Sequence, residues 1–116
     1  MQRKTIRNHK DFLTTKDDLK TSNDLFMVKA KTAKIPGDAR YGLLVTKKTF
    51  KFAVQRNRAK RLIRDWLNYN EHLMLDNLDY IIILHKSILD SDRETGRKTL
   101  AHVLIKISKR YKKNAK

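Results

Sequence analysis

The chain has 116 residues, and 28 Lys and Arg against 12 Asp and Glu give it a net charge of +16. A hydrophobic content of 40% is enough for a modest core, which excludes a wholly disordered basic tail. The length predicts a single domain over residues 1–116, with a basic tail expected to fray over residues 112–116. So large a charge repels itself in a folded protein, so we expect a polyanionic partner, with nucleic acid first.

Several classes of protein are excluded by what the sequence lacks. It has no cysteine, which rules out disulfides and thiolate sites and fits a reducing, cytoplasmic compartment. Apolar runs such as residues 80–84 are far shorter than the ~20 residues of a membrane span. The basic N-terminus has no apolar segment of the secretory type. We therefore expect a small cytoplasmic protein without a membrane partner.

The positive charge is placed in blocks. Residues 40–64 include nine basic residues and no acid, and residues 95–116 include eight basic residues and no acid. Most acids lie in residues 11–24 and 65–94. Blocks of one sign favour a binding face over an evenly solvated surface.

The N-terminal third predicts a helix followed by a strand. Asn8 as N-cap and Asp11 in the first turn begin the helix, and Phe12 and Leu19 form its short apolar stripe. Residues 25–31 are rich in strand formers. By the strand period of two, the residues that share one face are Phe26, Val28 and Ala30.

Two further strands are predicted. A Pro-Gly turn at residues 35–38 precedes a strand at 41–46, which we expect to form a hairpin with strand 25–31. Residues 80–85 contain three consecutive Ile, a run that indicates burial on both faces.

A final helix is predicted from the capping-box spacing of Ser91 and Glu94. Its apolar positions recur at helical intervals: Leu100, Val103, Leu104, Ile107 and Tyr111. Gly96 in the first turns is unfavourable for a helix. With the helix described next, the elements predict an α+β (mixed α/β) domain, one sheet with helices packed on it.

Residues 53–67 have the period of an amphipathic helix. At ~100° per residue its core-facing arc comprises Ala59, Leu62, Ile63, Trp66 and Leu67. A different arc contains Asn57, Lys60, Arg61 and Arg64, with Arg58 beside it and Arg56 at the helix start. An ordinary solvated helix mixes acids into its polar face, but this one has none before Asp65. Arg and Asn suit phosphate and RNA backbone, so the arc predicts a nucleic-acid contact.

This helix resembles the hallmark of the bacterial ribonuclease P protein family, Ala-Val-x-Arg-Asn-x-x-Lys-Arg-x-x-Arg. The matching residues here are Ala53, Val54, Arg56, Asn57, Lys60, Arg61 and Arg64. Residues 40–48 and 79–83 resemble two strands of that family, and residues 7–12 its first helix. The likeness covers about residues 3–111.

The resemblance implies a fold and a function. The fold is a single α-β-β-β-α-β-α domain with one central sheet and a left-handed β-α-β crossover through the basic helix. The function is that of a protein subunit of a ribonucleoprotein endonuclease, which removes the 5′ leader of precursor tRNA. The resemblance places the active site and its Mg²⁺ in the RNA subunit. It therefore implies no catalytic residue, metal ligand or organic cofactor in this chain, and no protein partner.

The resemblance also implies two sets of binding residues. Those for the catalytic RNA are Lys47, Lys48, Arg56, Asn57, Arg58, Lys60, Arg61 and Arg64. Those for the precursor-tRNA leader, in a cleft between the first helix and the sheet, are Phe12, Lys16, Phe26 and Val28. The ring of Phe12 would stack on a base there. Lys16 and Val28 stand where relatives often carry aromatic residues, and residues 48–52 replace a Gly-containing turn common in relatives.

Other interpretations remain open at this point. A structural RNA-binding protein of the ribosomal type shares the charge but does not need the motif spacing. Binding to an anionic membrane would use a basic helix, but the apolar face of this one is needed for a core. Phe50 and Phe52 are compatible with core packing or with base stacking. The histidines lack ligand spacing, so no metal site is predicted at His9, His72, His85 or His102.

Overall fold

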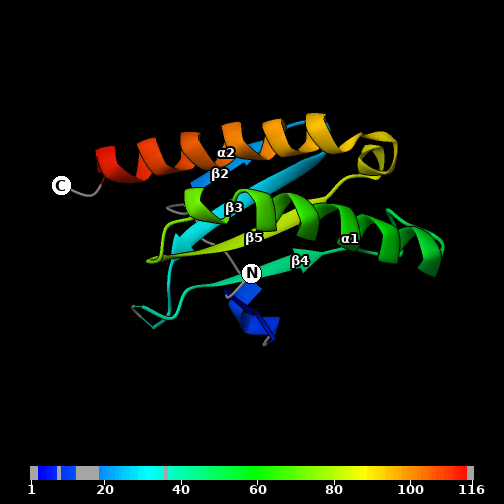
Figure 1. Cartoon of the computed structure of the whole chain (residues 1–116). Coiled ribbons are helices and arrows are strands. Elements are labelled where there is room, and N and C mark those ends of the chain that lie inside the picture. Colours follow the sequence, from blue (N-terminus) through cyan, green and yellow to red (C-terminus); the bar gives the residue numbers. More distant parts are fainter. Residues whose placement is uncertain (1–2, 8, 13–18, 36, 115–116) are drawn as a thin grey trace.

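The computed structural model describes residues 3–7, 9–12, 19–35 and 37–114, which form one mixed sheet and two α-helices (Figure 1). The strands are β1 (Lys4–Thr5), β2 (Leu19–Ser22), β3 (Phe26–Thr32), β4 (Arg40–Leu44) and β5 (Leu78–Leu84). The helices are α1 (Ala53–Tyr69) and α2 (Arg93–Asn114), and short 3-10 helices span His9–Phe12, Glu71–Leu73 and Lys86–Asp90. The predicted α+β domain with one sheet is confirmed.

The strand order in the sheet is β1-β4-β5-β3-β2. β5 is parallel to β4 and antiparallel to β3, and its Ile82 pairs with both Leu43 and Val28. The predicted hairpin between residues 25–31 and 41–46 is therefore wrong, because β5 lies between those strands. The physical reason is burial: the apolar β5 is the strand best suited to the centre, where both faces are covered.

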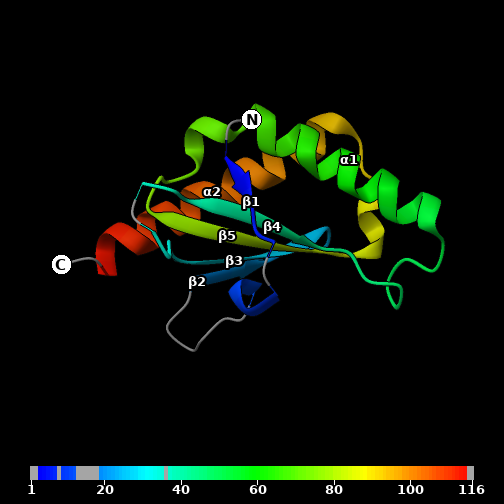
Figure 2. The same ribbon diagram turned by 90° about the horizontal axis from the view of Figure 1, so that it is seen from below.

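The connection from β4 through α1 to β5 has the less common hand. Both helices lie on one face of the sheet, which faces the viewer in Figure 1 and is turned upward in Figure 2. In Figure 1 the parallel strands β4 and β5 both run toward the right, with β5 above β4. With the helix in front, that order makes a left-handed crossover, whereas most β-α-β units are right-handed. The left-handed crossover implied by the family resemblance is present.

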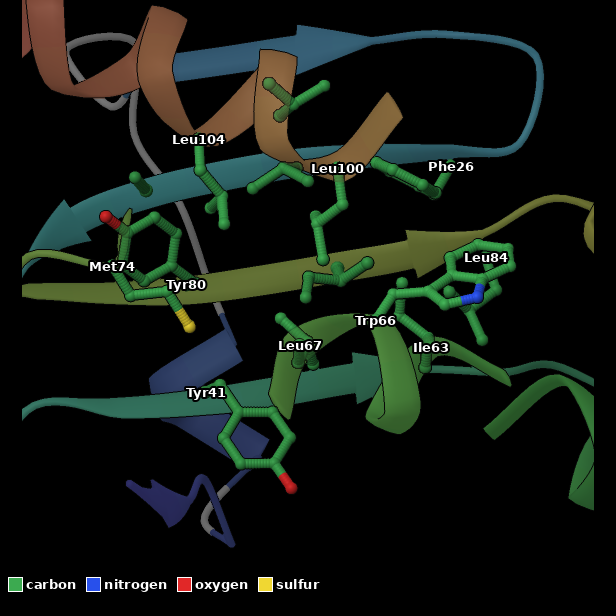
Figure 3. Packing of buried hydrophobic residues seen from close by; sticks show 14 of the residues in the cluster. Phe26, Tyr41, Ile63, Trp66, Leu67, Met74, Tyr80, Leu84, Leu100 and Leu104 are labelled. Carbon is green, nitrogen blue, oxygen red and sulfur yellow. The ribbon is translucent and has the colours of Figure 1, made fainter. Parts of the chain in front are cut away.

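The core lies between this face of the sheet and the two helices (Figure 3). The predicted alternation of β3 is confirmed, since Phe26, Val28 and Ala30 are all buried against the helices. Trp66 of α1 packs near Phe26, with ring centroids 6.4 Å apart. The buried helical residues are Ala59, Ile63, Trp66 and Leu67 of α1 and Leu100, Val103, Leu104 and Ile107 of α2.

The contact between α1 and α2 depends on a glycine and a buried amide. A Cβ on Gly96 would lie 2.1 Å from Cε2 and Cζ2 of Trp66, so only glycine fits where α2 crosses the indole. Asn70, which is 2% exposed, donates from Nδ2 to the carbonyl oxygens of Trp66 and Arg97, each at 3.0 Å. These two residues join the end of α1 to the start of α2.

The N-terminal segment departs from the predicted helix. His9–Phe12 is a 3-10 helix, and Leu19 begins strand β2, where its side chain is buried. Phe12 and Leu19 therefore do not share a helical stripe, and that prediction is wrong. The proposed N-cap, Asn8, lies outside the described residues.

Helix α2 begins one residue later than its capping box predicts. Asp92, rather than Ser91, is the cap: its Oδ1 accepts a hydrogen bond from the backbone N–H of Thr95 at 2.7 Å. Hydrogen bonds from Thr95 hold the pKa of Asp92 below its usual value. At the other end α2 continues to Asn114, so the part of the expected frayed tail that the structure describes, residues 112–114, is helical.

Candidate nucleic-acid interface

The predicted division of α1 into an apolar and a basic side is present in the structure. The apolar side is buried against the sheet and α2, and Leu62 at its margin is half-buried. The exposed polar side carries Asn57, Arg58, Arg61 and Arg64, and Arg56 and Lys60 are half-buried at its margins. The core thus fixes the rotation of the helix and directs the basic residues outward.

The one acid of α1 is already neutralised. Asp65 accepts hydrogen bonds from Nε of Arg97 at 3.3 Å and from Nη2 at 3.2 Å, and Nε of Arg93 lies 3.8 Å from it. The Arg97 guanidinium also lies over the Tyr69 ring, 4.2 Å from its centroid. Because α2 supplies these partners, Asp65 is not left to offset the arginines of α1. The sequence did not indicate this role for Arg93 and Arg97.

Two of the predicted RNA-binding arginines also have partners within the protein. Nη1 of Arg56 donates to the carbonyl oxygen of Phe50 at 2.8 Å and to that of Lys51 at 3.3 Å. Nη2 of Arg58 lies 3.4 Å from the carbonyl oxygen of Leu89. Arg56 therefore holds the loop before α1 in place, in addition to any contact with RNA.

That loop places two exposed lysines and an exposed ring beside the start of α1. Lys47 and Lys48 lie in a turn closed by a hydrogen bond from the Phe50 N–H to the Thr46 carbonyl at 2.9 Å. The side chain of Phe50 is fully buried, whereas that of Phe52 is 57% exposed. Of the two interpretations left open by the sequence, core packing applies to Phe50, and only Phe52 is accessible for stacking.

The sheet face away from the helices carries Phe12. A Cβ on Gly42 would lie 2.5 Å from Cε1 of Phe12, so the ring lies directly on the β4 backbone at that glycine. Phe12 is half-buried there. Figure 2 shows the 3-10 helix that ends at Phe12 on the side of the sheet opposite α1 and α2.

The other predicted leader-binding residues do not join Phe12. Phe26 and Val28 are 0% exposed on the helix-covered face, so no leader can reach them, and this part of the prediction is corrected. Lys16 lies outside the described residues. On β3 the residues that share the face of Phe12 are Met27, Lys29 and Lys31, all half-buried. The sequence signal for this face was the alternation within β3, where Met27, Lys29 and Lys31 alternate with the buried Phe26, Val28 and Ala30.

Neither a metal cluster nor a membrane span is found in the part of the chain that the structure describes. Its His, Asp and Glu residues form no group of three or more that could hold a metal ion. None of its helices combines the length and the apolar character needed to cross a bilayer.

Relatives identified by sequence share one description. The family model for Ribonuclease P matches residues 1–108. A ribonuclease P protein component of Pseudoalteromonas translucida is 40% identical over 76 residues, which are 66% of this chain and 54% of that protein. One of Marinobacter nauticus is 32% identical over 96 residues, 83% of this chain and 70% of that protein. The chain thus matches between about half and about two thirds of the length of these relatives.

Solved structures with the same fold carry the same description. The RNase P protein of Staphylococcus aureus superposes with a TM-score of 0.72 at 32% identity, covering 90% of this chain and 94% of that one. The RNase P protein of Thermotoga maritima gives a TM-score of 0.74 at 26% identity, covering 90% and 97%. The motif on α1, the sheet order and these matches agree: the chain belongs to the ribonuclease P protein family.

Proposed function

We propose that this chain is the protein subunit of a bacterial ribonuclease P and that the basic face of α1 binds the catalytic RNA. The observation that carries the proposal is the charge of that face. It exposes Arg58, Arg61 and Arg64, and its one acid, Asp65, is held by Arg97. Phosphate groups stabilise such a face because they replace the repulsion between arginines with attraction. Membership of the family supports RNA as the polyanion.

We propose a second contact on the opposite face of the sheet, with the single-stranded 5′ leader of precursor tRNA. Phe12 is half-buried above Gly42, so part of its side chain is accessible, and a base stacked on an aromatic side chain contributes about 1–3 kcal/mol. Lys29 and Lys31 lie on the same face and supply positive charge along it. This revised leader site replaces the set that included Phe26 and Val28.

The chemistry of the reaction is assigned to the RNA subunit, which would also hold the Mg²⁺. The role of this chain is then to reduce the repulsion between two RNA molecules and to position the substrate. Basic side chains do this by neutralising phosphates, which lowers the concentration of Mg²⁺ needed for the same purpose. Catalytic RNA and precursor tRNA are the only partners that the proposal requires.

The α1 contact is tested by an Arg61→Gln variant in binding measurements with a bacterial ribonuclease P RNA at several salt concentrations. We expect weaker binding and a slope of log K against log salt that is smaller by about one ion. Lys112→Gln removes one exposed charge from the end of α2 and should leave the slope nearly unchanged. Equal slopes for Arg61→Gln and the unaltered protein would refute the assignment.

The leader contact is tested by Phe12→Leu, which keeps an apolar side chain over Gly42 but removes the aromatic face. In the reconstituted holoenzyme we expect precursor tRNA to bind about tenfold more weakly, the lower part of the range for one stacked base. Mature tRNA, which has no leader, should bind as before. An equal loss for both tRNAs would show that Phe12 acts on the fold and not on the leader.

A further inference from the structure

The start of α1 exposes apolar side chains inside the most basic stretch of the chain. Phe52, the residue just before the helix, is 57% exposed, and Val54 in the first turn is 73% exposed. Together with the loop from β4, this part of the molecule forms its right-hand end in Figure 1. The basic residues proposed to bind the catalytic RNA account for the charge here, but not for an exposed aromatic ring.

The ring of Phe52 does not serve the helix on which it stands. Phe52 is the N-cap residue of α1, a position that favours Ser, Thr, Asp or Asn because their side chains accept a hydrogen bond from the first turn. A phenyl ring has no acceptor, and Phe52 makes no side-chain cap hydrogen bond. The helix therefore loses stability at this position, and the exposed part of the ring adds nothing to the core. Its role is a contact outside the chain.

The backbone that carries Phe52 is held in place before any partner arrives. The side chain of Phe50 is fully buried, and its carbonyl oxygen accepts a hydrogen bond from Nη1 of Arg56 at 2.8 Å. The backbone N–H of Arg56 donates to the carbonyl oxygen of Phe52 at 3.2 Å. Because the segment is already ordered, a partner that meets the ring loses little binding free energy to the ordering of this loop.

The surroundings of the ring are cationic. Lys47, Lys48 and Lys51 are all exposed, and Nζ of Lys51 lies 5.7 Å from the centroid of the Phe52 ring. Residues 40–64 include no acid. An aromatic ring among cations suits a partner that combines flat apolar surfaces with negative charge, as a nucleotide base and its phosphates do.

Two other occupants fit this surface less well. A second copy of the chain would bring two sets of these lysines together, on molecules that each carry a net charge of +16. An anionic bilayer is bound by helices that insert a continuous apolar face, and the apolar face of α1, which includes Ile63, Trp66 and Leu67, is buried in the core. RNA remains the partner that uses both the ring and the charge.

We propose that Phe52 stacks on an unpaired base of the catalytic RNA, while the neighbouring lysines meet the flanking phosphates. The inference rests on the proposed function, which supplies the RNA, and adds to it a contact that does not depend on charge. The base is unpaired because bases within an RNA helix are covered by their neighbours, whereas those in loops and bulges can stack on a side chain.

Phe52→Leu tests the contact, because leucine keeps an apolar side chain but has no aromatic face. Binding to a bacterial ribonuclease P RNA is measured at several salt concentrations. We expect a loss of about tenfold at every concentration, in the lower part of the range for one stacked base, with the slope of log K against log salt unchanged. The Arg61→Gln variant described above should instead reduce the slope.

Ile35→Ala is the matched control, since Ile35 is 58% exposed but lies toward the other end of the sheet. It follows Thr32, which pairs with the first residue of β5, whereas α1 follows β4, whose last residue pairs with Ile83 near the end of β5. Loss of this apolar side chain should leave binding to the RNA unchanged. Thermal unfolding of both variants checks that each is folded.

Phe52→Trp gives a direct signal of stacking, because a base stacked on an indole quenches its fluorescence. Trp66 is the one tryptophan of the chain and is 0% exposed, so it contributes a constant background. We expect this variant to bind the RNA at least as tightly as the unaltered chain and to lose emission as it binds. A ring that only supported the loop would give no such quenching.

The possible failures are distinguishable. RNA binding that is equal for Phe52→Leu and the unaltered chain would overturn this inference and leave the proposed function standing, whereas no RNA binding by the unaltered chain would oppose both. A reduced salt slope for Phe52→Leu would show that the ring acts only by placing the lysines, and would also overturn it.

Two measurements without RNA test the other occupants. A blue shift in the emission of Phe52→Trp on addition of phosphatidylcholine–phosphatidylglycerol vesicles at physiological salt would assign the ring to a membrane. A dimer in analytical ultracentrifugation that Phe52→Leu abolishes would assign it to a second copy of the chain. Either result would overturn the stacking assignment, and we expect neither.

Discussion

Gly96 shows how one residue can be misjudged from sequence and explained by structure. In a helix glycine costs up to about 1 kcal/mol relative to alanine, so its presence near the start of α2 counts against that helix. The structure gives the compensating reason, because the position is filled by the indole of Trp66, 2.1 Å from where a Cβ would be. The sequence contains both residues but nothing that brings them together.

Gly96→Ala is therefore expected to destabilise the protein despite the higher helix propensity of alanine. Overpacking of this kind costs about 1–3 kcal/mol, which exceeds the gain in propensity. Urea unfolding measures the change as a lower midpoint with a similar slope. Ser108→Ala, a half-buried position on the same helix, serves as the propensity control and should be neutral or slightly stabilising. A Gly96→Ala protein as stable as the parent would contradict the packing seen here.

The residue that caps α2 is a second feature that the sequence alone did not determine. Ser91 and Asp92 are both good N-cap residues. Each could accept a hydrogen bond from the backbone N–H three positions later, at Glu94 or at Thr95. Only the backbone decides between them, and it places Asp92 opposite the Thr95 N–H. The helix was predictable, but its first residue was not.

At the scale of elements, the spacing of residues within a segment predicted which of its side chains are buried. Which strands pair, and which face of the sheet is covered, depends on contacts between segments that are distant in the sequence. The apolar arc of α1 and the alternation of β3 both follow from the spacing of their own residues. The neighbour of β3 does not, because β5 comes about fifty residues later and inserts beside it. The prediction that Phe26 and Val28 bind the leader was wrong for the same reason. Phe26 and Val28 do share a face, but the two helices cover that face, and no feature of the β3 sequence itself indicates this.

The junction of α1 and α2 gives a prediction at this scale. Asn70 satisfies carbonyl groups at the end of α1 and at Arg97 in α2, in a buried site. Asn70→Ala should lower the free energy of unfolding by about 2 kcal/mol, since buried acceptors lose their donor. Asn68→Ala, an exposed asparagine of the same helix, should change it by less than about 0.5 kcal/mol. Similar values for the two variants in chemical denaturation would show that the junction does not depend on this amide.

At the scale of the whole molecule, the net charge of +16 is divided among distinct surfaces. The α1 face and the sheet face that carries Phe12, Lys29 and Lys31 point in different directions, because the two helices cover one face of the sheet and Phe12 lies on the other (Figure 2). The charge blocks in the sequence predicted binding faces, but only the folded structure shows that these faces point in different directions.

Self-repulsion of this charge should make the free protein respond to anions. Sulfate or phosphate that binds only the folded state raises its melting temperature by mass action, beyond what screening alone provides. We expect sulfate to stabilise the protein more than chloride at equal ionic strength, measured by thermal unfolding. Removing Arg61 and Arg64 together by substitution with Gln should reduce that difference. Equal melting temperatures in both salts would indicate screening only, without a bound anion.

The most direct test of the central claim is reconstitution of the reaction. The full chain is mixed with a bacterial ribonuclease P RNA and a precursor tRNA at physiological salt and at a Mg²⁺ concentration too low for the RNA alone. The account predicts that the chain restores cleavage at the mature 5′ end and that Arg61→Gln weakens this effect, with recovery at higher Mg²⁺. Failure of the unaltered chain to restore cleavage under these conditions would contradict it.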